Sequence, residues 1–129
     1  MQRARSALLF GTISLALAPV MSAHHSAVAS YQAGEPISVK GKVLEFAWSN
    51  PHCHFYIDVT DGPFRGRTYT VELSNPSTLA RDGWSKTTLR PGDEVIVKVL
   101  PSRNGAPIGL CRQCALTING TLLRKTSGN

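Results

Sequence analysis

The sequence predicts an all-β domain with one short helix, arranged as a small five-stranded barrel of the OB type. Three strand-like segments come first, then a helix signal, then two or three more strands, which is the OB order. The first segment is long and carries Gly41 at its centre, as a strand that curls around a barrel requires. A small β-sandwich built from the same strands is the alternative.

Six segments show the alternation of apolar and polar residues that is typical of half-buried strands. Their expected ranges are Ile37–Phe46, Cys53–Thr60, Thr68–Leu73, Glu94–Leu100, Ile108–Ile118 and Thr121–Leu123. Turns that contain proline or glycine separate these segments, and Asn119-Gly120 predicts a two-residue hairpin. A short helix is expected over Asn75–Arg81, with Asn75 as its N-cap and Gly83 able to end it.

The first 23 residues match a cleavable secretory signal peptide. Arg3 and Arg5 give a positive start, and Pro19–Ala23 ends the segment in small residues. The apolar run Ala7–Ala18 between them is too short to span a bilayer, which takes roughly 20 residues. An uncleaved anchor and a buried first helix are the alternatives. We predict export to the periplasm or beyond, with no transmembrane segment after cleavage.

Cleavage would leave an N-terminal arm over residues 24–36, a β domain over 37–123 and a polar tail over 124–129. Without Arg3 and Arg5 the net charge falls from +6 to +4. The basic residues are scattered rather than gathered in a run, so we expect no nucleic-acid partner. A mild positive charge fits solubility or weak attraction to anionic envelope surfaces.

The histidines suggest the sharpest chemistry, because all four fall in two clusters. His24 and His25 form one cluster, and His52 and His54 form the other. Neutral imidazole is a common ligand for copper, zinc and nickel. We therefore name these four residues as candidate metal ligands and copper as the expected metal. The alternatives are a solvated arm, a simple β-turn over residues 50–52 and a surface position for His54.

The signal cleavage site would decide which histidines bind. Cleavage after Ala23 makes His24 the first residue, so that its amine and its ring chelate one copper ion with His52 or another histidine as the third nitrogen. Cleavage after Ser22 places His25 third in the chain. The amine, two backbone amides and one ring can then bind Cu(II) or Ni(II) in a square plane, a geometry that both ions favour.

Three cysteines are present, an odd number for an exported protein, in which disulfides are expected. Cys111 and Cys114 have Cys-x-x-Cys spacing, but they lie among strands and not at the helix N-terminus that activates redox thiols. They could form a local disulfide that closes a bulge, or a thiolate pair for Cu(I) or Zn(II), with or without Cys53. A single Cys-x-x-Cys excludes a four-thiolate zinc site.

Motifs for catalysis are missing from the sequence. It has no Gly-x-Ser-x-Gly, phosphate loop or His-Glu-x-x-His. The carboxylates Asp58, Glu72 and Asp93 are interpreted as ordinary strand or turn residues. Trp48 and Trp84 are candidates for stacking a ligand, as OB faces do, and partial burial at the barrel ends is their alternative.

Three groups of residues together resemble a family of small secreted bacterial proteins of unknown function. They are His24-His25-Ser26, then Gly41-Lys42-Val43 with Trp48-Ser49-Asn50-Pro51-His52, and Gly83-Trp84 with Leu89-Arg90-Pro91-Gly92-Asp93. Members carry a His-His-Ser start, a Trp-x-Asn-Pro-His segment and a Leu-Lys/Arg-Pro-Gly-Asp turn. The resemblance spans about His24 to Leu123 and implies export and an OB-like fold, with no assigned activity. The three cysteines are not part of that pattern.

Three functions are compatible with these features. The first is a periplasmic copper-binding protein that uses the N-terminal and Asn-Pro-His histidines. The alternative is a non-catalytic OB-type module that binds an oligosaccharide, a peptide or an envelope protein. A copper enzyme that uses the same N-terminal histidine ranks last, because the sequence offers no obvious substrate groove.

Overall fold

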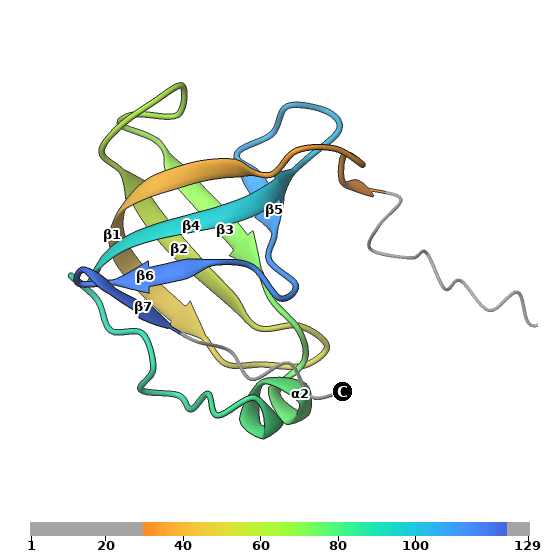
Figure 1. The fold of residues 1–129 in the computed structure, drawn as a ribbon, viewed down its shortest axis with the longest axis vertical. Helices are drawn as coiled ribbons and strands as arrows, with labels where there is room; N and C mark the ends of the chain where they lie inside the picture. Colours follow the sequence, from red (N-terminus) through yellow and green to blue (C-terminus); the bar gives the residue numbers. More distant parts are fainter. Residues whose placement is uncertain (1–29, 124–129) are drawn as a thin grey trace, which may run out of the picture.

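The structure, a computed structural model, describes residues 30–123 (Figure 1). The expectations for the signal peptide, for His24 and His25 and for the polar tail lie outside these residues. The elements are β1 (Ile37–Ala47), β2 (His54–Val59), β3 (Thr68–Glu72), α2 (Pro76–Arg81), β4 (Glu94–Pro101), β5 (Ile108–Leu110), β6 (Leu116–Ile118) and β7 (Thr121–Leu123).

Five strands form a closed ring in the order β1-β2-β3-β5-β4, and pairing between β1 and β4 completes it (Figure 1). The pair β3–β5 is parallel and the other pairs in the ring are antiparallel. The hairpin of β6 and β7 extends from β4 outside the ring. This arrangement confirms the predicted all-β fold with one short helix and a small barrel, and the sandwich is not adopted.

Strand β1 closes the barrel because it pairs on both sides. Its first half, Ile37–Lys42, pairs with β4, and its second half, Gly41–Ala47, pairs with β2. A Cβ at Gly41 would overlap the backbone carbonyl of Asp58, so glycine permits the close approach where the two pairings meet. The register shifts at Leu44, where a bulge increases the local bend.

Alternating residues of the ring strands fill the barrel, as the period of a strand requires. The buried core includes Val39, Val43, Phe55, Ile57, Tyr69, Val71, Val95, Val97, Val99 and Leu116. Leu79 of α2 belongs to the same cluster, together with Trp84 and Leu89 from the segment that follows. Asn75 caps α2 by accepting a 2.9 Å hydrogen bond from the Thr78 amide, so this helix begins as predicted.

The predicted single strand over Ile108–Ile118 is wrong, because the chain forms two short strands there. The sulfurs of Cys111 and Cys114 are bonded, and their Cα atoms lie 5.1 Å apart. Residues three apart in a strand are separated by roughly 10 Å, so a disulfide of this spacing requires a turn. Gln113 takes a left-handed conformation with φ of 54° inside that turn.

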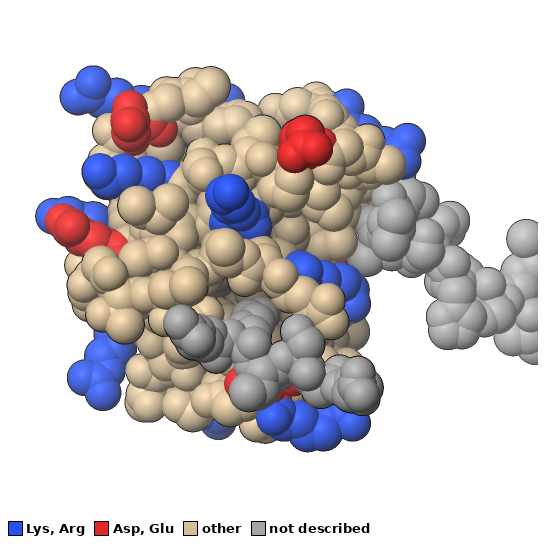
Figure 2. All heavy atoms as spheres, in the orientation of Figure 1, with Lys and Arg blue, Asp and Glu red and all other residues tan. Residues whose placement is uncertain are grey.

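Charge is spread over the surface rather than concentrated. In Figure 2 the lysine and arginine side chains of the described residues are distributed over the visible face, with a few carboxylates between them. The loop Asp61–Arg67 and strands β1 and β4 all contribute basic residues. This face therefore presents no single large patch of one sign.

The Tyr69 hydroxyl lies in the core and has no hydrogen-bond partner among residues 30–123. Its ring is fully buried, and the hydroxyl adjoins Gly109, where a Cβ would lie 2.9 Å from it. Burial raises the pKa of Tyr69 to about 12. The unfolded chain ionises tyrosine near pH 10, so this residue destabilises the folded state once the pH rises above about 10.

We expect Tyr69→Phe to keep or slightly raise the free energy of unfolding below about pH 10, because it removes a buried hydroxyl without a partner. At about pH 12 the variant should be more stable than the wild type by about 2 kcal/mol. The reason is that the variant has no tyrosine at this position whose ionisation would favour the unfolded state. Urea unfolding at about pH 8, 10 and 12 measures both effects. Parallel loss of stability in the two proteins would contradict this account.

Candidate functional site

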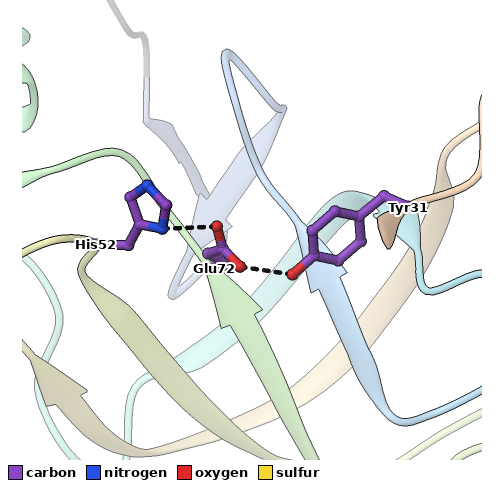
Figure 3. Close-up of polar contacts among 3 residues, drawn as sticks. All are labelled: Tyr31, His52 and Glu72. Carbon is purple, nitrogen blue, oxygen red and sulfur yellow. Dashed lines mark hydrogen bonds and ion pairs between the residues drawn. The ribbon is translucent and has the colours of Figure 1, made fainter. Parts of the chain in front are cut away.

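Glu72, at the end of β3, joins two side chains from distant parts of the chain (Figure 3). Its Oε1 lies 2.9 Å from Nδ1 of His52, at ion-pair distance. Its Oε2 accepts a 2.6 Å hydrogen bond from the Tyr31 hydroxyl. The three residues therefore form one connected polar chain on the outside of the barrel.

The register of β2 and β3 places His52 beside Glu72. His54 is the direct cross-strand partner of Glu72. The ladder continues through Cys53, whose amide donates to Ser74 O at 3.1 Å and whose carbonyl accepts from the Leu73 amide at 2.8 Å. His52 follows a cis peptide bond between Asn50 and Pro51 and lies immediately before this ladder. Its ring can therefore reach the carboxylate at the end of the neighbouring strand.

Backbone contacts with the end of β4 hold Tyr31 in place. Tyr31 forms an isolated bridge with Ser102, and the Gln32 amide donates to Pro101 O at 2.8 Å. The Arg103 side chain donates to the Tyr31 carbonyl at 2.7 Å. Tyr31 is 4% exposed, so this part of the expected arm is packed against the barrel. Its hydroxyl is thereby fixed against the carboxylate.

The surroundings of Tyr31 favour the neutral form of its hydroxyl. The Glu72 side chain is 13% exposed, and a carboxylate so buried requires partners. Burial raises the pKa of Tyr31 far above its ordinary value, and the hydrogen bond and negative charge of Glu72 raise it further. The hydroxyl of Tyr31 therefore stays protonated and donates to Glu72.

The contact with Glu72 also orients the His52 ring. Apart from this ion-pair contact, the buried Oε1 has no hydrogen-bond partner among the described residues. Because Oε1 bears only lone pairs, the neutral ring is stabilised with its hydrogen on Nδ1, facing the carboxylate. Nε2 then carries the free lone pair. The side chain of His52 is 34% exposed, so part of the ring is open to solvent.

Two of the four predicted histidine ligands, His52 and His54, lie in the described residues. His54 is half-buried, and as the cross-strand partner of Glu72 it projects from the same face of the sheet. Within residues 30–123, no three His, Cys, Asp or Glu side chains come together as a ligand set. The described residues thus bring one ring and its carboxylate together but do not form a complete metal site.

The three cysteines differ in oxidation state. Cys111 and Cys114 form a disulfide, so in this state they offer no thiolate pair. Cys53 is a free and fully buried thiol. Burial raises its pKa, against a weaker opposite effect of a hydrogen bond from the Ser49 backbone. A protonated, enclosed thiol is a poor metal ligand.

The two tryptophans lie near one end of the barrel with Phe46 between them. The ring of Phe46 makes an edge contact with Trp48 at 5.7 Å and a tilted contact with Trp84 at 6.1 Å. Trp84 is 4% exposed and belongs to the core, which leaves it little surface for a stacked ligand. Trp48 is half-buried and keeps part of its surface open.

The sequence pattern does not mark Glu72 and Tyr31 as site residues. Glu72 fits the pattern of an ordinary strand carboxylate, yet it is the central residue of the site. Tyr31 lies in a polar segment with little periodicity. One signal was available, because Tyr31 is the only aromatic residue other than histidine between His24 and the first strand. Asp93 does act as interpreted, because its Oδ2 accepts a 2.8 Å hydrogen bond from the Arg90 amide of the same turn.

None of the helices in residues 30–123 is long and apolar enough to cross a membrane.

Comparison with other proteins places the chain in a family. The chain has no match among curated proteins or solved structures. A family model described as "Family of unknown function (DUF6152)" matches residues 12–113, which include β1 to β5 and the three site residues. The predicted resemblance to a family of unknown function is confirmed, and the chain belongs to this family.

Proposed function

We propose that this protein is an exported copper-binding protein and that Nε2 of His52 is one of its metal ligands. The observation that carries the proposal is the 2.9 Å contact between His52 Nδ1 and Glu72 Oε1. Histidines that bind metals almost always donate their second ring N–H to a carboxylate, a carbonyl or water. Such a partner fixes the tautomer and increases the basicity of the ligating nitrogen.

The carboxylate is itself held, which is the second support. Tyr31 donates to Glu72 at 2.6 Å and is buried against the barrel. The carboxylate therefore cannot turn away from His52 without losing a charge-assisted hydrogen bond. The ring of His52 is thus held by Glu72, which is in turn held by the buried Tyr31.

The remaining ligands would come from the arm that precedes Tyr31. His24 precedes Tyr31 by seven residue steps, which can span up to about 25 Å when extended. Tyr31 contacts the same carboxylate that contacts His52. The arm is therefore long enough to bring His24 or His25 to Nε2 of His52. Nitrogen ligands of this kind suit Cu(II), and an N-terminal amine would add another.

We expect His52→Ala to weaken Cu(II) binding by at least about 100-fold, because it removes a ligand and not only a supporting partner. The measurement is a calorimetric titration of protein recovered from the envelope of an exporting host, with its first residue established by intact mass. The comparison variant is His54→Ala, which removes the neighbouring ring from the same face and should weaken binding less. Equal affinities for the wild type and His52→Ala would disprove the role of His52.

We expect Tyr31→Phe to weaken Cu(II) binding by about tenfold, because Glu72 would lose the donor that holds it toward His52. Tyr31 is a positioning residue, so the variant should still bind one ion with nitrogen ligands, as copper electron paramagnetic resonance would show. Tyr69→Phe is the matched control, since it removes a buried tyrosine hydroxyl that bonds no carboxylate. If both phenylalanine variants bind copper as the wild type does, Tyr31 plays no part in positioning the ligand.

A further inference from the structure

The disulfide turn is attached directly to the site residue Glu72. The amide of Cys111 donates to the Glu72 carbonyl at 2.8 Å, and Leu110 is the parallel cross-strand partner of Glu72. Strand β5 has only three residues, so this bond is the last rung of a short ladder. The backbone of Glu72 is thus held from one side by β2 and from the other by the start of the disulfide turn.

The same turn acts on Tyr31 through a charge. Arg112 lies between the two cysteines and is exposed. Burial and Glu72 raise the pKa of Tyr31, and the positive charge of Arg112 opposes this rise only weakly. Residues of the disulfide turn therefore influence both the backbone of Glu72 and the hydroxyl that holds its side chain.

The two sulfurs differ in their access to solvent. Cys111 is 1% exposed and belongs to the hydrophobic core, whereas Cys114 is only partly buried at its edge. Between them Gln113 has a φ of 54°, in the left-handed region that non-glycine residues seldom adopt. The disulfide closes the turn that contains this residue.

We propose that the Cys111–Cys114 disulfide is a redox-active pair, opened at Cys114 by an exported dithiol reductant, and that opening it weakens the metal site at His52. The second half of this proposal rests on the proposed copper function. The first half concerns only the disulfide and the backbone of Glu72.

The reaction is an ordinary thiol–disulfide exchange. A thiolate of the reductant attacks Sγ of Cys114, which forms a mixed disulfide and releases Cys111 as a thiolate. The second thiol of the reductant then attacks its own sulfur in the mixed disulfide and releases Cys114. Two electrons pass to the protein, the reductant leaves as a disulfide, and its two thiol protons end on Cys111 and Cys114.

Opening the pair would affect the site through the backbone. The turn would no longer be closed by a covalent bond, so the hydrogen bond from the residue 111 amide to Glu72 O would break more often. Glu72 would then fluctuate at the end of β3, and with it the orientation of the His52 ring. Because this effect acts one step beyond the carboxylate, we expect a fall in Cu(II) affinity at the lower end of the range for supporting partners, about tenfold.

The first experiment tests the redox step without metal. The folded, processed protein is treated with dithiothreitol and then with iodoacetamide, and intact mass and peptide mapping locate the labels. We expect Cys114 to be labelled first, while the buried thiol of Cys53 stays unlabelled as an internal control. A disulfide that resists dithiothreitol in the folded protein, and opens only when the chain unfolds, would overturn the proposal.

The second experiment tests the link to Glu72, also without metal. Hydrogen–deuterium exchange of the amide at residue 111 is compared between oxidised protein, reduced protein and the double variant Cys111→Ala/Cys114→Ala. We expect faster exchange in both forms that lack the disulfide. The control Cys53→Ala removes a buried thiol that belongs to no disulfide, so the amide should stay protected. Unchanged exchange in the reduced protein would overturn the link.

The third experiment measures Cu(II) affinity in the double variant, which has no turn thiols that could reduce the ion. We expect a roughly tenfold loss relative to the wild type and little change in Cys53→Ala. Wild-type affinity in the double variant would overturn the metal half of the proposal. If the wild type itself bound no copper, the proposed function would fail, and the first two experiments would still decide the redox half.

Discussion

The carboxylate of Glu72 is the point on which the other contacts of the site depend. Its backbone is paired with His54 of β2 and with Leu110 of β5, and its side chain contacts His52 and Tyr31. A carboxylate at 13% exposure is costly unless polar partners compensate its lost hydration. Displacing any one partner of Glu72 would therefore leave its carboxylate partly uncompensated. A turn, the end of strand β3 and the start of the described chain are linked through one side chain.

The barrel could be predicted because its signals are local. Strand alternation, the Asn75 cap and the glycine at position 41 each depend on a few neighbouring residues, and all three agree with the OB order. The error at Ile108–Ile118 has the opposite cause. Apolar residues on both sides of the cysteines continue a plausible strand pattern, while the bond between Cys111 and Cys114 requires a turn between them. Covalent closure overrides the local preference of the sequence.

The site could be predicted only in part, for a related reason. His52 was found because histidines are few and their chemistry is known, and this needs no tertiary information. Glu72 required the register of β2 against β3, which a loop of several residues between Asp61 and Arg67 does not fix, unlike a two-residue hairpin. Tyr31 lies 41 residues from its carboxylate partner, so no local pattern connects them. The sequence shows which residue types are present, but it does not show which of them contact one another.

The orientation of the His52 ring helps to decide which N-terminal residue would suit the proposed copper site. If the chain began at Ala23, the amine, two backbone amides and the ring of His25 would fill the square plane of Cu(II). Those four nitrogens would satisfy the ion without His52. If the chain began at His24, its amine and ring would supply only two nitrogens, and His52 would be needed as a third. Because the Glu72 contact orients the His52 ring as partners of metal-binding histidines do, it supports the chelate that begins at His24, in which His52 is needed as a ligand.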